Sequence, residues 1–294
     1  MQRILLLLVF SLLLISCEKA ITFQPDKGTD AVVIDATIEN EQSPVVILSK
    51  SFSYFSRLSP ALLASSFQRN ADVTLSNGVQ SHRLREYSVE VAPGYNFYYY
   101  SIDSANLSTA FKGELGRSYS LSVKVNNQDF TATTTIPFLT KTIDSLWWIK
   151  APFNTDSNKV LIMARATDPP GYGNYIRYFT STNGQAFYPG LTSVFDDQIV
   201  DGKTYSVQVE KGVNRNQEID FENYSFFDKG DTVKVKMTNI DKSTFDFWRT
   251  MEYSYSSIGN PFASPTRVLG NIQGGALGYF GGYAAQYREI IIPK

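Results

Sequence analysis

The stretch RSYSLSVKV at residues 117–125, followed by Asn126-Asn127 and by QDFTATTTI at residues 128–136, decides the fold class. In its first half, apolar side chains alternate with polar ones, at Tyr119, Leu121, Val123 and Val125. This period of two is typical of a β-strand with one buried face. We therefore expect one strand that ends at Val125 and a return strand over residues 130–136.

The same alternation, interrupted by turn signals, extends over residues 31–137. Val32 to Glu39 alternates in this way, and Asn77-Gly78 is a strong hairpin signal because both residues tolerate positive φ. About seven short strands with turns every 8 to 12 residues are typical of an immunoglobulin-like or fibronectin-like sandwich. We expect residues 31–137 to form an N-terminal β-sandwich domain. Residues 59–66, with Pro60 near the start, can form a brief helix or a loop.

A second series of strands follows a predicted linker at residues 138–142 and begins at Ile143. Asn183-Gly184 is another hairpin signal within it. After residue 240, large apolar residues recur in three- and four-residue steps, at Phe245, Trp248, Met251 and Tyr255. This spacing predicts an amphipathic helix at about residues 241–257, capped by Asp241 or Ser243.

The composition agrees with a chain made mainly of strands. It contains 18 Tyr and 20 Phe, and only 19% of its 294 residues are charged, which suits half-buried strands better than surface helices. The predicted fold class is therefore all-β, with two tandem β-sandwich domains at 31–137 and 143–294, the second carrying the helix. The 27 basic residues are balanced by 28 acidic ones, so nucleic acid is not an expected partner.

Residues 1–16 have the pattern of a bacterial lipoprotein signal peptide. Arg3 precedes an apolar run from Ile4 to Ile15, and small Ser16 stands directly before Cys17. The run of about 12 residues is too short for a membrane-spanning helix, which needs roughly 20. Because Cys17 is the only cysteine, we expect it to carry lipid rather than a disulfide, with residues 17–30 as a tether.

Histidine and cysteine are too few for several kinds of site. The only histidine, His82, lies in the polar stretch Ser81-His82-Arg83, where we expect it to be exposed rather than part of a Ser-His-Asp triad. A zinc or iron site built on several Cys and His residues cannot form, because lipid consumes Cys17. The sequence therefore predicts no catalytic residues, no metal and no cofactor.

Three acids, Asp196, Asp197 and Asp201, lie close together in the sequence near aromatic residues. Paired carboxylates can cleave a glycosidic bond, and their oxygens can hold calcium. The regular Asp-x-Asp-x-Asp-Gly calcium loop is absent, however. We interpret the three acids as a solvated turn before the strand that begins at Gly202.

Two runs of adjacent aromatic residues, Trp147-Trp148 and Tyr98-Tyr99-Tyr100, are candidate contacts for a ligand or partner. Neighbouring strand residues point to opposite faces, so at least one ring in each run faces away from its own core. Such a ring can stack on a sugar or on a partner protein. It can equally pack against the neighbouring domain, which we favour for the tryptophan pair beside the linker.

The C-terminal part carries specific motifs. They are Asn260-Pro261-Phe262-Ala263-Ser264-Pro265, Gly270-Asn271-Ile272, and a run containing Gly274, Gly275, Gly278 and Phe280-Gly281. Asp246-Phe247-Trp248-Arg249, Asn70-Ala71-Asp72-Val73 and Ile143-Asp144-Ser145-Leu146 are further motifs. Together they resemble domain-of-unknown-function family 4249, a lipoprotein family of Bacteroidota. We interpret the prolines and glycines as structural, because clustered glycine most often marks tight geometry.

The resemblance implies an outer-membrane lipoprotein with an accessory role in the cell envelope, since members are often encoded near TonB-dependent receptors. It implies no established activity and supplies no catalytic residues. The leading hypothesis is a non-enzymatic partner of a TonB-dependent receptor, anchored by the lipid on Cys17 at the surface or the periplasmic face. The alternatives are a stand-alone module that binds a glycan or peptide, or acts in adhesion, and a carboxylate-dependent glycan hydrolase.

Overall fold

A computed structural model describes residues 31–52, 59–152, 154–258, 260 and 266–294. The predicted signal peptide and the tether with Cys17 lie outside these residues. The described chain is built mainly of strands, with a longer helix, α3 (Lys242–Ser256), near the C-terminus. The all-β prediction and the predicted helix are therefore confirmed. None of the described helices is long and apolar enough to cross a membrane.

The first half of the described chain contains eight strands and two short helical segments. These are β1 (Val32–Glu39), β2 (Val45–Lys50), α2 (Pro60–Ser66), β3 (Asp72–Ser76), β4 (Ser81–Arg83), β5 (Arg85–Ala92), β6 (Tyr95–Ser101), η1 (Leu107–Thr109), β7 (Arg117–Val125) and β8 (Gln128–Ile136). The remaining strands are β9 (Thr142–Lys150), β10 (Lys159–Thr167), β11 (Tyr175–Thr182), β12 (Tyr188–Phe195), β13 (Thr204–Val209), β14 (Phe227–Asp228), β15 (Thr232–Ile240) and β16 (Leu277–Ile291).

Strands β7 and β8 form the hairpin that the sequence predicts over residues 117–136. Val125 pairs with Gln128, and Asn126 and Asn127 make the turn with φ of 51° and 60°. Both asparagines adopt the positive φ that a two-residue hairpin loop requires. The alternating apolar residues of β7 are buried, at Tyr119, Leu121, Val123 and Val125.

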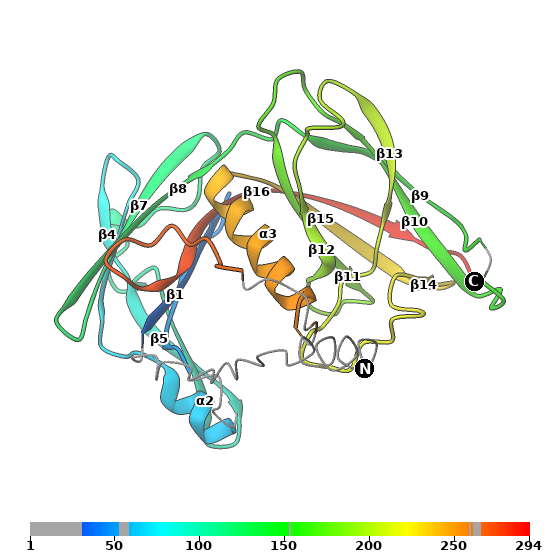
Figure 1. Cartoon of the computed structure of the whole chain (residues 1–294). Coiled ribbons are helices and arrows are strands. Elements are labelled where there is room, and N and C mark those ends of the chain that lie inside the picture. Colours follow the sequence, from blue (N-terminus) through cyan, green and yellow to red (C-terminus); the bar gives the residue numbers. More distant parts are fainter. Residues whose placement is uncertain (1–30, 53–58, 153, 259, 261–265) are drawn as a thin grey trace, which may run out of the picture.

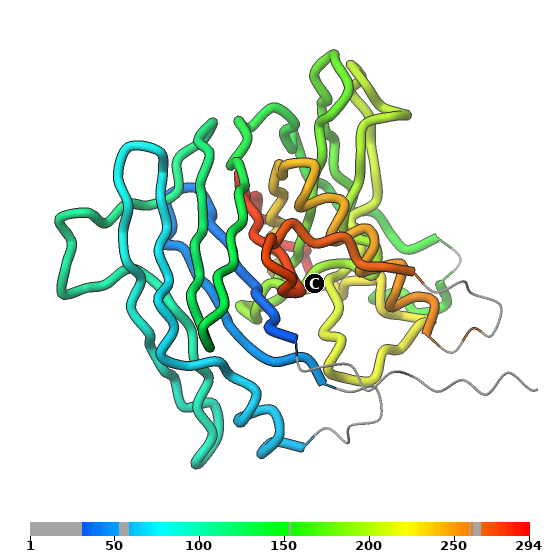
Figure 2. Tube along the Cα trace, turned by 60° about the vertical axis from the view of Figure 1, so that its left-hand side comes forward, coloured from blue at the N-terminus to red at the C-terminus, as the bar shows by residue number. Residues whose placement is uncertain are grey.

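An eight-stranded sheet forms the centre of the molecule, in the order β12-β11-β15-β16-β1-β2-β6-β5. Strands β1 and β16 are parallel, whereas the other neighbouring pairs are antiparallel. Strand β1 runs beside the first half of β16, with Val33 opposite Leu277 and Glu39 opposite Tyr283 (Figure 2). Their close approach requires Gly278, because a Cβ there would lie 2.0 Å from the Ile34 carbonyl oxygen.

Two four-stranded sheets cover one face of the large sheet, near its two ends (Figure 1). One contains β4, β3, β7 and β8 and packs on the large sheet through a core that includes Ile34 and Phe280. The other contains β9, β10, β13 and β14, and its core includes Val235, with Ile290 of β16 packed against it. Phe280 and Ile290 lie an even number of residues apart on β16, so both small sheets cover the same face.

Helix α3 packs on the opposite face of the large sheet, against Tyr279 and Tyr283 of β16. The ring of Phe247 stacks on Tyr279 with centroids 4.2 Å apart. Asp241 begins the helix: its Oδ1 accepts from the backbone N–H of Thr244 at 2.8 Å. Its Oδ2 accepts from the backbone N–H of Thr135 at 3.0 Å, which ties the start of the helix to β8.

The predicted linker, residues 138–142, joins the two small sheets and packs against the large one. Lys141 within it is fully buried. Its backbone N–H donates to Oδ1 of Asn239, and its carbonyl oxygen accepts from the side-chain amides of Asn239 and Gln286. The large sheet takes strands from both predicted domains, so the two cores share one sheet. The domain boundaries themselves stay a prediction.

Candidate functional site

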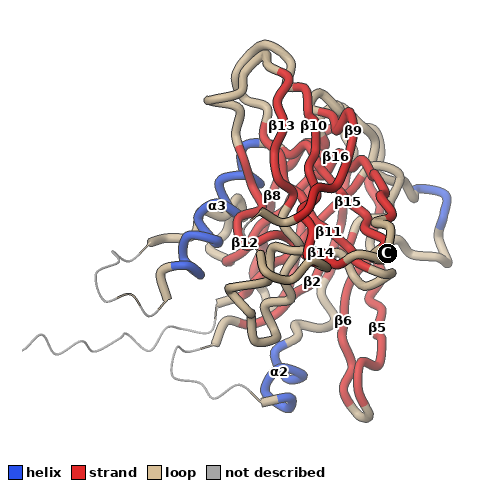
Figure 3. Tube along the Cα trace, turned by 90° about the vertical axis from the view of Figure 1, so that its right-hand side faces the viewer, coloured by secondary structure: helices blue, strands red, loops and turns tan. Residues whose placement is uncertain are grey.

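Strands β5 and β6 form a hairpin that carries the predicted Tyr98-Tyr99-Tyr100 run. Figure 3 shows them extending from the molecule at the end opposite to β9, β10 and β13. Within the described part of the chain, β5 is the last strand of the large sheet and pairs with β6 alone. The outer edge of β5 therefore leaves backbone groups open to a further strand.

One face of this hairpin is aromatic and partly exposed. Tyr87 lies opposite Tyr99, and Val89 lies opposite Phe97, so the four side chains share a face. The rings of Tyr87 and Tyr99 stack with centroids 5.7 Å apart, and Val89 is 51% exposed. We call these four residues the hairpin aromatic face.

The other face of the hairpin is held in the fold. Tyr100 is 2% exposed, donates its hydroxyl to Oε2 of Glu86 at 2.8 Å and accepts from the backbone N–H of Ala71 at 3.0 Å. The guanidinium of Arg69 lies 4.1 Å from the ring centroid of Tyr98. Of the predicted tyrosines, Tyr99 is thus the one on the aromatic face, and Tyr100 belongs to the core.

A hollow of about 350 Å³ lies beside the hairpin, lined by residues that include Asn70, Arg83, Arg85, Glu86 and Asp103. Its charges are paired: Arg83 with Asp72 at 2.9 Å, Arg85 with Asp103 at 3.7 Å and Arg69 with Glu86 at 3.1 Å. Burial alone would raise the pKa of Glu86, but hydrogen bonds from Asn70, Tyr100 and Arg69 hold it below its usual value. Glu86 is therefore an ionised acceptor at neutral pH, suited to binding rather than to proton donation.

The predicted tryptophan pair lies on β9, in the small sheet at the other end of the molecule. Trp148 pairs with Ile162, a fully buried core residue, and Trp147 pairs with Met163 on the opposite face. Trp148 is nevertheless 36% exposed. The structure therefore does not bring the tryptophans and the tyrosines together into one site.

Two described residues of the C-terminal motifs, Asn271 and Gly274, contact the fold itself. Asn271 bonds through its side-chain amide to both backbone groups of Phe280, with its Oδ1 accepting and its Nδ2 donating at 2.8 Å. Gly274 has φ of +97°, and a Cβ there would lie 2.4 Å from the Asp129 carbonyl oxygen. Gly275 has open space around it, and Asn260 is exposed. The other predicted motif residues, Pro261, Phe262 and Pro265, lie outside the described residues.

The expected solvated turn is wrong for Asp197, which is 1% exposed. Its Oδ2 accepts from the backbone N–H groups of Gly173 and Asn174, both at 2.8 Å. These bonds outweigh burial and hold the pKa of Asp197 below its usual range. The acid therefore fixes the neighbouring loop, a contact that local polarity in the sequence could not reveal.

Asp168, Asp197 and Asp201 form one group of acids close enough to share a cation, within the residues that the structure describes. The group already contains a positive charge, because Nζ of Lys141 lies 2.9 Å from Oδ1 of Asp168. Backbone N–H groups of Gly202 and Gly171 bond to Asp168 and Asp201. This arrangement is a buried structural network.

The expectation that His82 is exposed is also wrong, since its side chain is fully buried. Its Nδ1 lies 2.8 Å from Oγ1 of Thr109, and its Nε2 accepts from the backbone N–H of Asp103 at 3.0 Å. Nε2 is thus unprotonated and Nδ1 carries the proton. Burial lowers the pKa of His82, against the opposing charge of Asp103, so the ring is neutral and structural at neutral pH.

A second buried polar network, which the sequence does not predict, lies under α3. Arg177 stacks on Trp248, with its Cζ 3.4 Å from the ring centroid, and donates from Nε to Oγ of Ser193 at 3.1 Å. Ser193 in turn donates to the carboxylate of Glu252 through its backbone N–H and its hydroxyl. These residues come from β11, β12 and α3, so no local sequence pattern could show that they meet.

Comparison with known proteins gives a family but no activity. A family model described as a domain of unknown function, DUF4249, matches residues 18–289. No curated protein matches the sequence. The match begins at the residue after Cys17 and covers nearly all of the described chain.

Proposed function

The chain belongs to the DUF4249 family, and from this premise we propose that it is an outer-membrane lipoprotein that acts as a non-enzymatic binding partner of a TonB-dependent receptor. The lipoprotein signal supports the anchor. Small Ser16 precedes Cys17, and the family match starts directly after this cysteine. A lipid on Cys17 would hold the protein at the membrane without a spanning helix.

The hairpin aromatic face is the observation that carries the binding role. It joins partly exposed aromatic and apolar side chains to the open edge of β5, at a point where the hairpin projects from the molecule (Figure 3). A partner strand added to such an edge gains backbone hydrogen bonds as well as side-chain contacts. The receptor would have to supply an extended loop or terminal segment, because a closed barrel leaves no strand edge of its own free.

The anchor and the partnership are tested together by purification from the native membrane. The tagged, lipidated protein is extracted from its own outer membrane in mild detergent, and the co-purifying proteins are identified. We expect a β-barrel receptor in near-stoichiometric amount, and we expect its loss for Cys17→Ala. Recovery of the lipoprotein alone, in detergent that preserves known receptor complexes, would overturn the proposal and favour a stand-alone module.

The docking surface is tested by placing charge on the hairpin edge. Lysine on an edge strand opposes strand addition, so Val89→Lys/Val91→Lys should lower receptor recovery by at least roughly tenfold. Val79→Lys is the matched control, because Val79 is 84% exposed and lies in the turn between β3 and β4. Equal receptor recovery with the wild type, the hairpin double variant and Val79→Lys would place the receptor contact elsewhere on the molecule.

A further inference from the structure

A pocket of about 220 Å³ lies between the start of β10 and the segment that connects β13 to β14. This segment, residues 210–226, has no helix or strand. Connections longer than roughly 12–15 residues without secondary structure are uncommon in compact domains and are often functional. This volume equals that of roughly seven water molecules, which suits a small ligand rather than a drug-sized one.

The connecting segment is fixed to the large sheet, so the pocket is preformed. The backbone N–H of Gly212 donates to Oγ1 of Thr180 at 2.6 Å, and that of Val213 donates to the Pro189 carbonyl oxygen at 2.9 Å. Arg215 donates through Nη2 to the carbonyl oxygen of Leu191 at 2.9 Å. A ligand would therefore find its contacts already ordered, which lowers the entropic cost of binding.

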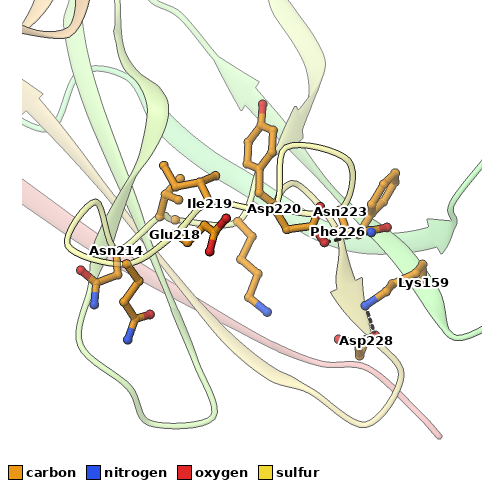
Figure 4. A pocket seen from close by; sticks show the side chains of 13 residues that line it. Lys159, Asn214, Glu218, Ile219, Asp220, Asn223, Phe226 and Asp228 are labelled. Carbon is orange, nitrogen blue, oxygen red and sulfur yellow. Dashed lines mark hydrogen bonds and ion pairs between the residues drawn. The ribbon is translucent and has the colours of Figure 1, made fainter. Parts of the chain in front are cut away.

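Carboxylates and amides dominate the polar wall of the pocket. They come from Glu218, Asp220, Asp228, Asn214, Gln217 and Asn223. Figure 4 shows Asn214 and Glu218 on one side, with Asn223 and Asp228 on the other. Carboxylates accept hydrogen bonds, and amides both donate and accept, so this wall suits a ligand with several hydroxyl groups.

Two of the acids are held in defined positions. Asp220 accepts from the Asn223 side-chain amide at 3.0 Å and from the backbone N–H of Glu222 at 3.1 Å. Lys159 donates to Oδ1 of Asp228 at 2.7 Å, as the dashed line in Figure 4 marks. The ammonium of Lys159 is thus already paired. Lys211 also lines the pocket, so two lysines stand against the three carboxylates of Glu218, Asp220 and Asp228, and this near balance of charge favours a neutral ligand.

Aromatic rings complete the pocket. Tyr224 and Phe226 line it, and Phe221, which is 70% exposed, packs edge-on against Tyr224 with centroids 6.3 Å apart. The negative face of an aromatic ring attracts weakly positive C–H groups such as those on one side of a sugar ring. The same small space thus offers hydroxyl-binding groups and an apolar platform.

We propose that this pocket binds a neutral hexose unit. Its hydroxyl groups bond to the carboxylates and amides, and its C–H face lies against the aromatic rings. The inference does not rest on the receptor partnership, because the hairpin and the pocket lie toward opposite ends of the eight-stranded sheet.

The proposal is tested by saturation-transfer NMR on the full-length lipidated protein in a detergent without sugar groups. The probes are methyl glucoside, methyl galactoside, methyl mannoside and N-acetylglucosamine, each titrated to about 10 mM, the range of weak binding. We expect transfer to at least one of them, strongest at its ring C–H protons. Trialanine is the control ligand without a sugar. Transfer to none of the four sugars, or to trialanine alone, would overturn the proposal.

The site is assigned with Gln217→Ala/Glu218→Ala, which removes two exposed wall side chains. The affinity for the bound sugar should fall by at least roughly tenfold, the loss expected for removing hydrogen bonds to a polar ligand. Gln128→Ala/Asp129→Ala is the matched control, because it removes an equally exposed Gln-acid pair from the start of β8. An unchanged affinity in the pocket variant would show that the sugar binds elsewhere and would also overturn the proposal.

Discussion

Lys141 and Asp168 form an ion pair in which both side chains are fully inaccessible to solvent, with Nζ and Oδ1 2.9 Å apart. The pair lies where the segment between the two small sheets packs on the large one. Removing two charges from water costs several kcal/mol, so such a pair stabilises the fold only while both partners remain. A single substitution at either residue should therefore lower the free energy of unfolding markedly.

We predict that Lys141→Met lowers the free energy of unfolding by about 3–5 kcal/mol, because it leaves the carboxylate of Asp168 buried and unpaired. The double variant Lys141→Met/Asp168→Leu should lose less than the sum of the two single variants. The double variant should not regain the full stability of the wild type, because the backbone N–H of Gly202 loses Asp168 as its acceptor. Urea unfolding of the four proteins measures this coupling, and strict additivity would contradict the structure.

Glu86 makes the stability of the β5–β6 hairpin depend on pH. Its pKa lies below the usual 4.5, since hydrogen bonds from Asn70, Tyr100 and Arg69 outweigh burial. A carboxyl group with a lowered folded pKa contributes stability above its unfolded pKa, and this contribution is lost as the pH falls through the folded value. Burial raises the pKa of Tyr100 to about 12, so its hydroxyl remains a donor throughout this range.

We therefore predict that the β5–β6 hairpin loosens as the pH falls below 4.5, the usual pKa of a glutamate side chain. Hydrogen exchange of peptides over residues 85–101, corrected for the intrinsic effect of pH, measures this loosening. Glu86→Gln should show weaker protection at pH 7 and little further change on acidification. A wild-type hairpin whose protection is constant from pH 7 to pH 3 would contradict this role of Glu86.

Residue environments were the least predictable feature from the sequence. His82 and Asp197 have polar neighbours along the chain, yet both are buried because distant backbone groups meet their polar atoms. The pocket beside β10 could likewise not be predicted from the sequence, since its lining combines Lys159 with residues from 211–228. In contrast, alternation along a strand is purely local, so the sequence predicted that at least one ring of the Tyr98-Tyr99-Tyr100 run faces away from the core, as Tyr99 does.

Secondary structure elements follow local periodicity, so the sequence predicted most of them. The hairpin at residues 117–136 and the helix at 241–257 appear as β7, β8 and α3. The order of strands within the large sheet was not predictable, because β1 pairs with β16 from the far end of the chain. The only local feature of this pairing is Gly278, which lets the backbones of β1 and β16 approach each other.

We predict that Gly278→Ala is much more harmful than Gly275→Ala. Both glycines have similar φ, +103° and +91°, so both substitutions place alanine in a region that costs about 1–2 kcal/mol. A Cβ at Gly278 would also overlap the Ile34 carbonyl oxygen, whereas a Cβ at Gly275 meets nothing within 4 Å. The added overlap should bring the loss for Gly278→Ala to at least roughly 3 kcal/mol.

Urea unfolding of the two variants isolates the close approach of β1 and β16 from the effect of φ. The glycine at 275 serves as the matched control because it has a similar φ and lies just before β16, whereas Gly278 lies within the strand. Equal losses of stability for the two variants would mean that the parallel pairing tolerates a side chain at this position.

At the scale of the whole molecule, β16 is the element that both cores share. Phe280 and Ala284 contribute to the core under β7 and β8, and Ile290 packs against the core under β10. A sequence that predicts two sandwiches does not reveal a common sheet, since sheet sharing depends on long-range pairing. The candidate hairpin and the candidate pocket are thereby placed on one continuous framework.

We predict that the protein unfolds in a single cooperative transition, because neither core can lose β16 without exposing the other. Phe280→Ala and Phe227→Ala remove fully buried rings from the two different cores and should each cost about 3–5 kcal/mol. Calorimetry should show both variants lowering the same Tm, with equal calorimetric and van't Hoff enthalpies. Asp129→Ala, at an exposed position near the start of β8, is the control that should leave Tm nearly unchanged. Two resolved transitions, each shifted by only one of the phenylalanine variants, would instead establish independent domains at residues 31–137 and 143–294.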